Sequence, residues 1–119
     1  MNTMTAEALA LAKALLDHHA RIRQRPGGPP RDVDACLIPY GTLCDRAGLP
    51  HLTRAVGSFL QEVAEWCRDK GWPPINSLAV NQDSRMPGEG YDLAPGCSLL
   101  HWPDQVKRCI AFAGYPDTI

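Results

Sequence analysis

The sequence has little of several features that mark specialised classes of protein. It contains no Cys-x-x-Cys pair, and its five cysteines are irregularly spaced, which argues against a zinc site and against a disulfide framework. No apolar run approaches the roughly 20 residues that cross a bilayer, so we expect no membrane partner. The net charge is only −1 at pH 7, which argues against a protein that coats nucleic acid by charge alone.

The composition that remains is that of an ordinary globular domain. The chain has 119 residues, of which 45% are hydrophobic and 21% charged, and this length suits one domain better than two. Glu7 and Lys13 interrupt the apolar stretch at the start of the chain, so a secretory signal is not expected. We expect a cytoplasmic protein with reduced, mostly buried thiols, and with neither metal nor cofactor.

Helical periodicity predicts four helices. Thr5 is placed to cap the first, which must end before the Pro/Gly-rich segment that starts at Pro26. A short helix is expected over 41–47 and a last one from Pro103 to Gly114. The strongest pattern predicts a helix over 51–70, closed by Gly71. Its apolar stripe consists of Leu52, Val56, Phe59, Leu60, Val63 and Cys67.

The segment after Pro73-Pro74 predicts a hairpin. Its apolar residues between 75 and 80 indicate one short strand, and residues 91–93 a second, with turn-forming residues between them. The element order favours an α+β, mostly helical, winged helix-turn-helix-like domain with a short β-hairpin wing. The single domain would span 1–119. Its parts are an N-terminal helix and basic Pro/Gly loop (1–30), a helix-turn-helix (38–71), and a wing with a C-terminal helix (72–119).

Four arginines cluster at the end of the first predicted helix and in the loop that follows. No acidic residue occurs between His18 and Arg31. This cluster, which we call the basic collar, could contact phosphates or an acidic protein surface, and a solubilising loop is the other interpretation. The collar consists of Arg21, Arg23, Arg25 and Arg31.

One segment carries a family resemblance. Residues 38–57 read Ile-Pro-Tyr-Gly-Thr-Leu-Cys-Asp-Arg-Ala-Gly-Leu-Pro-His-Leu-Thr-Arg-Ala-Val-Gly. This resembles the DNA-binding module of the O6-alkylguanine DNA alkyltransferases and of their non-catalytic relatives, the alkyltransferase-like proteins. In that family a Tyr opens a short helix and Arg-Ala-Val-Gly begins the recognition helix. The resemblance implies that Tyr40 crowds a phosphate and that Arg54 enters the minor groove, filling the gap left by a flipped nucleotide.

The resemblance weakens beyond Gly57. The family's Pro-Cys-His-Arg sequence, whose Cys accepts the alkyl group, is missing. Alignment on residues 77–80 and on the Gly-Glu-Gly-Tyr sequence of residues 88–91, which we call the glycine-rich loop, puts Asn76 at the position of that Cys. Ser77 and Leu78 then replace the His and Arg. Because no thiolate–histidine pair is present, we expect no alkyl transfer and no enzymatic activity.

Three functional hypotheses follow. The first is a DNA-binding module that contacts duplex DNA through Tyr40, Arg46, Thr53, Arg54 and Ser58, with the basic collar on phosphates. The second is a protein-interaction module that docks on a larger complex, such as an anti-CRISPR-like inhibitor borne by a phage or mobile element, or an antitoxin-like accessory protein. The third is a nucleophilic site at Cys97, with His101 four residues away, or at Asn76. Irregular flanks and the lack of an orienting group argue against it.

Overall fold

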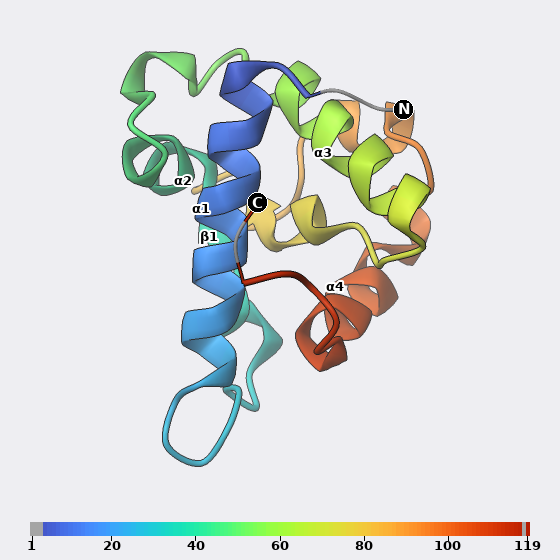
Figure 1. Cartoon of the computed structure of the whole chain (residues 1–119). Coiled ribbons are helices and arrows are strands. Elements are labelled where there is room, and N and C mark those ends of the chain that lie inside the picture. The colour runs from blue at the N-terminus through green and yellow to red at the C-terminus, as the bar shows by residue number, and fades with distance from the viewer. Residues whose placement is uncertain (1–3, 118) are drawn as a thin grey trace.

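The structure, a computed structural model, describes residues 4–117 and 119, so residues 1–3 and 118 of the predicted segments lie outside it (Figure 1). The described part contains four α-helices: α1 (Ala6–Arg23), α2 (Tyr40–Arg46), α3 (Val56–Lys70) and α4 (Trp102–Ala111). Its strands β1 (Ile38–Pro39) and β2 (Ala79–Val80) pair in parallel. Its 3₁₀ turns are η1 (Val33–Cys36), η2 (Pro50–Leu52), η3 (Ile75–Leu78), η4 (Glu89–Leu93) and η5 (Leu99–His101). The predicted mostly helical α+β class is confirmed.

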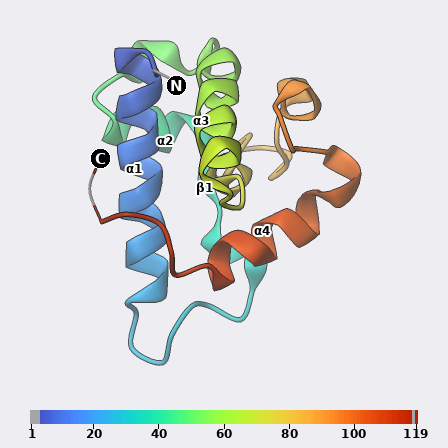
Figure 2. The ribbon, with the colours of Figure 1, turned by 45° about the vertical axis from the view of Figure 1, so that its right-hand side comes forward.

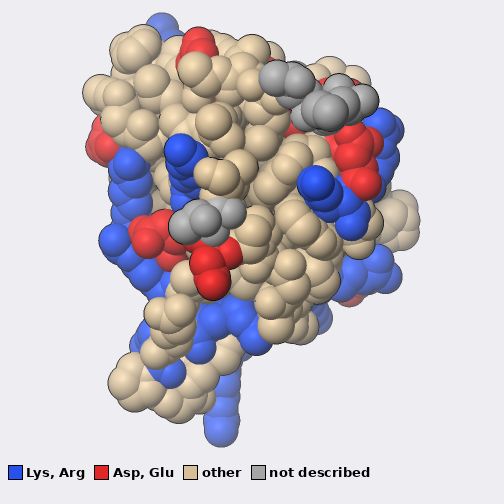
Figure 3. Space-filling model, in the orientation of Figure 1, with Lys and Arg blue, Asp and Glu red and all other residues tan. Residues whose placement is uncertain are grey.

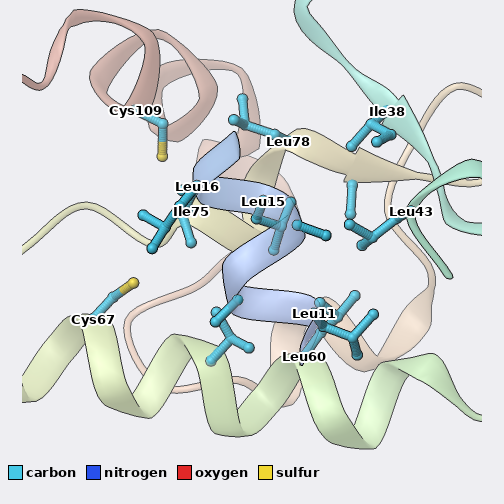
Figure 4. Close-up of a cluster of buried hydrophobic side chains, with 14 of the residues drawn as sticks. Leu11, Leu15, Leu16, Ile38, Leu43, Leu60, Cys67, Ile75, Leu78 and Cys109 are labelled. Atoms are coloured by element: carbon cyan, nitrogen blue, oxygen red, sulfur yellow. The ribbon is translucent and has the colours of Figure 1, made fainter. Parts of the chain in front are cut away.

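Helix α1 begins as predicted and lies at the centre of the packing. The Thr5 hydroxyl caps it by accepting a hydrogen bond from the Ala8 N–H at 3.2 Å. Helices α2 and α3 and the η3 turn all pack against α1. Leu11 and Leu15 of α1 are fully buried, and Figure 4 shows them surrounded by side chains from these elements. The core is therefore assembled around one helix.

The cysteines behave as small hydrophobic residues. All five are free thiols, and Cys36, Cys44, Cys67 and Cys109 are buried. Cys67 and Cys109 belong to the same core cluster as Leu15, as Figure 4 illustrates. This arrangement confirms the expectation of buried thiols that are not in disulfides.

Helix α3 begins later than predicted. Residues 50–52 form the separate η2 turn, and the regular helix starts at Val56 rather than at His51. Pro50 starts η2 without donating a backbone hydrogen bond, and Ala55 lies outside the helical region at φ −105° and ψ 7°. The helix ends as predicted at Gly71, whose φ of +76° is left-handed. Arg54 consequently lies in the turn before the helix.

The predicted β-hairpin wing is wrong. Strand β2 pairs with β1 rather than with residues 91–93, which belong to the 3₁₀ turn η4. The chain between them closes on itself because the Asn81 N–H donates to the Met86 carbonyl at 2.9 Å. Tyr91 then turns inward, is 6% exposed, and hydrogen-bonds Ser77 at 2.6 Å. Residues 91–93 thus form a 3₁₀ turn that is bonded to η3 through Tyr91, and they do not return as a strand.

Helix α4 closes the fold beside η3. It starts at Trp102, with Pro103 in its first turn, and ends at Ala111, three residues before the predicted Gly114. The Trp102 indole N–H donates to the Ser77 carbonyl at 2.8 Å, which connects α4 to η3. Within the described residues, no helix has both the length and the apolar content required to cross a bilayer.

Two buried histidines make the stability of this fold pH-dependent. His18 donates from Nε2 to the Cys36 carbonyl at 2.7 Å, and His19 to the Cys109 carbonyl at 2.8 Å. Burial lowers the pKa of both imidazoles below the ordinary value of 6.5. The unfolded chain therefore binds more protons than the folded chain as the pH falls through 6.5. The neutral histidines stabilise the fold above that pH, and this stability is lost below it.

We expect the melting temperature to be lower at pH 5 than at pH 7.5, measured by circular dichroism. A His19→Gln variant, whose amide keeps a hydrogen-bond donor, should show a smaller difference between the two pH values. Equal melting temperatures at both pH values for the unmodified protein would contradict this assignment.

Candidate functional site

The candidate site is a pocket of about 480 Å³ between the two helices of the predicted helix-turn-helix and the loop that follows β2. The start of α2 contributes Tyr40, the turn before α3 contributes Thr53 and Arg54, and η3 contributes Asn76. Residues of the 81–94 segment line the opposite side. Three of the five residues predicted to contact DNA therefore meet at one pocket.

Around the start of α3, residues 53–55, 57 and 58 are exposed, whereas Val56 is buried. Arg54 is exposed and takes part in none of the ion pairs between described residues. The Thr53 hydroxyl donates to the Pro50 carbonyl at 3.3 Å and the Ser58 hydroxyl to the Ala55 carbonyl at 3.2 Å. These local bonds leave the lone pairs of both hydroxyls available to a ligand. Ser58 lies next to the pocket in sequence but is outside its described lining.

Tyr40 connects α2 to the glycine-rich loop. Its hydroxyl oxygen accepts a hydrogen bond from the Gly88 N–H at 2.8 Å. Burial raises the pKa of this phenol, so the hydroxyl keeps its proton and can donate it to a ligand. A Cβ built on Gly88 would lie 3.8 Å from the Tyr40 hydroxyl oxygen, which is ordinary van der Waals distance. Tyr40 therefore positions the glycine-rich loop and also presents a hydrogen-bond donor to the pocket.

Asn76 lies at the buried side of the pocket. Its side chain is 3% exposed, and its Nδ2 donates to the Cys97 Sγ at 3.6 Å. Its Oδ1 is buried without a hydrogen-bond partner among the described residues. Burial raises the pKa of the Cys97 thiol, which keeps this sulfur protonated and weakly nucleophilic. The neighbouring His101 is exposed in η5.

A hydrogen-bond network fixes the loop side of the pocket. The Tyr91 hydroxyl contacts both the Ser77 hydroxyl and the Gln105 Oε1. Gln105 also donates from Nε2 to the Gly96 carbonyl at 2.8 Å. Since Gln105 belongs to α4 and Ser77 to η3, the loop is connected to two elements of the core. This network keeps the segment carrying Gly90 and Tyr91 opposite α3.

Arg46 and the basic collar lie away from the pocket. Arg46 lines a separate shallow hollow together with Arg21 and Lys13. Arg21 pairs with Asp17 at 2.9 Å, and Arg23 donates to the Ile110 carbonyl at the end of α4. The Arg23 guanidinium thus satisfies a terminal helix carbonyl.

The collar and the start of α3 are at opposite ends of the molecule. In Figures 1 and 2 the loop after α1 lies at the bottom and η2 at the top. Figure 3 shows Lys and Arg gathered over the lower part of that face, with acidic side chains just above them. Arg25 and Arg31, which belong to the loop after α1, are exposed. The collar and the start of α3 therefore do not form one continuous positive face.

Sequence patterns missed some pocket residues. Gln61 lies outside the predicted apolar stripe, yet it lines the pocket and its Nε2 donates to the Gly90 carbonyl at 3.5 Å. Tyr91 was expected in a strand. The Gly88-Glu89-Gly90-Tyr91 sequence was the signal available for this side of the site, because closely spaced glycines permit a chain to approach another element closely.

Among the described residues, no group of three His, Cys, Asp or Glu side chains could hold a metal ion. Comparisons of the chain with protein families, with curated proteins and with solved structures found no match. The pocket and its exposed rim are therefore the features from which function is inferred.

Proposed function

We propose that this chain is a non-catalytic DNA-binding protein of helix-turn-helix type, similar in its DNA contacts to the alkyltransferase-like proteins. In this proposal α3 is the recognition helix, and the loop of residues 81–90 takes the place of the expected wing. The observation that carries the proposal is the meeting of Tyr40, Thr53 and Arg54 around one pocket beside the start of α3. The family resemblance assigns Tyr40 and Arg54 to the DNA, and the DNA-binding hypothesis drawn from the sequence adds Thr53.

The chemistry of the rim supports contact with a polyanion. Arg54 supplies an exposed guanidinium, and the lining residues that the structure describes include no carboxylate. Ala55, Gly57 and Ser58 are exposed and small, so a nucleic-acid backbone can approach closely. Glu62, one turn further along α3, accepts hydrogen bonds from Thr5 at 2.9 and 3.0 Å. Its carboxylate is thereby drawn toward the start of α1.

The proposal assigns Arg54 to a groove and Tyr40 to a phosphate, with a nucleotide turned toward the pocket. Arg46 and the collar contribute only long-range attraction, because they lie apart from the pocket. Catalysis is absent from the proposal because Asn76, and not a cysteine, lies in the pocket lining. The nearby Cys97 thiol is held protonated by burial.

A protein-interaction module is the second candidate. The observation that favours it is the exposure of two leucines near η4 and η5, with Leu93 76% and Leu100 82% exposed. Exposed apolar side chains of this kind contribute to protein–protein contacts when they form a contiguous patch. A chain that binds no DNA would favour this candidate.

Titration of labelled duplexes tests the proposal. One plain duplex and one carrying O6-methylguanine are titrated with the protein at ~50 mM and ~150 mM salt, with fluorescence anisotropy as the readout. We expect saturable binding at ~50 mM that weakens at ~150 mM, as counterion release requires. The protein recovered from the alkylated duplex should show no mass gain on any cysteine. Absence of binding at ~50 mM would overturn the DNA-binding proposal, and stoichiometric alkylation would overturn its non-catalytic part.

A further inference from the structure

The first half of the loop of residues 81–90 is folded into a closed turn. The Asn81 N–H donates to the Met86 carbonyl at 2.9 Å, and the Arg85 N–H donates to the Asn81 carbonyl at 3.0 Å. Arg85 has a φ of +57°, and among the described residues it is the one non-glycine residue with a positive φ. This conformation is uncommon for a residue with a side chain, and it persists where the surroundings hold it.

The Arg85 side chain is bound to η1, 51 positions earlier in the sequence. Its Nε donates to the Asp34 Oδ1 at 3.1 Å, and its Nη2 donates to Oδ2 at 3.3 Å and to the Asp34 backbone carbonyl at 2.8 Å. A guanidinium that meets both carboxylate oxygens forms a directional, two-pronged contact. Among the hydrogen bonds between described residues, these three are the ones that connect residues 82–86 to a part of the chain outside the turn.

This contact lies beside one wall of the candidate pocket. The loop lines the pocket on both sides of Arg85, through Asn81, Gln82, Gly88 and Gly90. Gly88 is held by the Tyr40 hydroxyl, as described above. Gln82 is exposed and makes no hydrogen bond with the described residues, so its position depends on the turn that Arg85 attaches to η1.

We propose that Arg85 is a positioning residue for DNA binding. Its contact with Asp34 holds the turn of residues 81–86 against η1, in the shape that forms one wall of the pocket. The proposal rests on the proposed function, since DNA is the ligand that uses this wall. Arg85 acts through the loop and does not itself contact a phosphate, because its guanidinium is occupied by Asp34.

The exposure of the pair separates this role from a role in global stability. The Arg85 side chain is 35% exposed and that of Asp34 is 56% exposed. Ion pairs this accessible contribute little to the free energy of unfolding, because water solvates both charges in either state. Such a pair can still order a loop, and a loop that is ordered before binding does not lose that conformational entropy on binding.

Two variants that change the net charge in opposite directions test the inference. Arg85→Asn removes the guanidinium, and asparagine tolerates the left-handed backbone, so the turn itself is kept. Asp34→Ala removes the carboxylate and leaves the Arg85 side chain free. Charge alone predicts weaker duplex binding for the first variant and tighter binding for the second. We expect both variants to bind about 2- to 10-fold more weakly, because the loop must then be ordered on binding.

Asp17→Ala is the matched control. Asp17 also pairs with an arginine, Arg21, at 2.9 Å, and its side chain is 55% exposed. It belongs to α1 and lies outside the described pocket lining. Its removal should leave duplex affinity unchanged or slightly increased, since it takes away a negative charge without releasing the loop. A loss of affinity equal to that of Asp34→Ala would show that the effect is not specific to the loop, and the inference would be wrong.

Relaxation of ¹⁵N-labelled backbone amides, measured without DNA, supplies a readout that is independent of binding. We expect residues 82–86 to become more mobile on the ps–ns timescale in Arg85→Asn and in Asp34→Ala, and to stay ordered in Asp17→Ala. The melting temperature should change little in all three variants. A lower melting temperature with an ordered loop would assign the contact to stability and not to positioning.

The outcomes separate this inference from the proposed function. If the loop stays ordered in both variants, if it becomes mobile without loss of affinity, or if the two variants change affinity in opposite directions, Arg85 does not position the loop for DNA, although DNA binding itself stands. If the unmodified protein binds no duplex, the proposed function is wrong, and the role of Arg85 in DNA binding is wrong with it.

Discussion

Replacing Leu15 with alanine is expected to lower the free energy of unfolding by about 2–5 kcal/mol. Leu15 is 0% exposed and lies in α1 at the centre of the core, among residues of α2, α3, η3 and β1 (Figure 4). Truncation removes buried methyl groups and leaves a cavity. The surrounding side chains belong to several elements, so they can shift only partly to fill it. Urea unfolding monitored by circular dichroism measures the change.

Phe59→Ala is the matched comparison. Phe59 belongs to the apolar stripe predicted for the third helix, but it is only half-buried. Its truncation should therefore cost about 1–2 kcal/mol, because a partly exposed ring gives up only part of its burial energy. A larger loss at Phe59 than at Leu15 would show that the centre of the core lies nearer α3 than α1.

Arg54→Ala is expected to weaken duplex binding by about 5- to 150-fold while leaving the melting temperature nearly unchanged. The binding loss corresponds to the ~1–3 kcal/mol typical of an arginine that contacts a base edge. Stability should not change because Arg54 is exposed and has no ion-pair partner among the described residues. Anisotropy titrations and thermal melts of the same preparation measure both quantities.

Arg108→Ala is the control for charge. It removes the same charge from an exposed position on α4, which lies away from the start of α3 (Figure 2). A loss of affinity that is the same for both variants would mean that Arg54 acts only through net charge. In that case the salt dependence of binding, and not its sequence preference, should change.

The helices could be predicted from the sequence because their signals are local. Thr5 begins α1 and Gly71 ends α3 where expected, since a capping hydroxyl and a left-handed glycine act on the adjacent turn. The start of α3 could not be predicted, because an uninterrupted helical pattern gives no sign that Pro50 begins a separate 3₁₀ turn. Local pattern thus predicts where a helix exists more reliably than where it begins.

The sheet could not be predicted because its pairing is non-local. Ile38 and Ala79 are far apart in sequence, and strands of two residues leave no period to detect. The local sequence around Tyr91 predicts a strand, because it contains no sign of the partners that hold the ring inward. These partners are the Ser77 hydroxyl and the side-chain amide of Gln105. The structure of this region therefore depends on contacts between residues that are far apart in the sequence.

The candidate site was predicted in part. Tyr40, Thr53 and Arg54 were found through a motif whose spacing the fold preserves at one pocket. Arg46 and the collar were grouped with them on charge alone, and the structure places Arg46 beside Arg21 instead. The charge of a residue does not indicate which other residues lie close to it in the fold. The spacing of a motif does, because it depends on how the two helices pack against each other.

An NMR titration of the ¹⁵N-labelled protein with a short duplex tests the central claim most directly. If DNA is bound as proposed, the largest shift changes should occur at the start of α2, in residues 53–61 and in the loop of residues 81–90. The amides around Leu100 should change little, because Leu100 is exposed and neither it nor its sequence neighbours belong to the described pocket lining. Changes confined to the basic collar, or to the Leu93 and Leu100 region, would contradict the account.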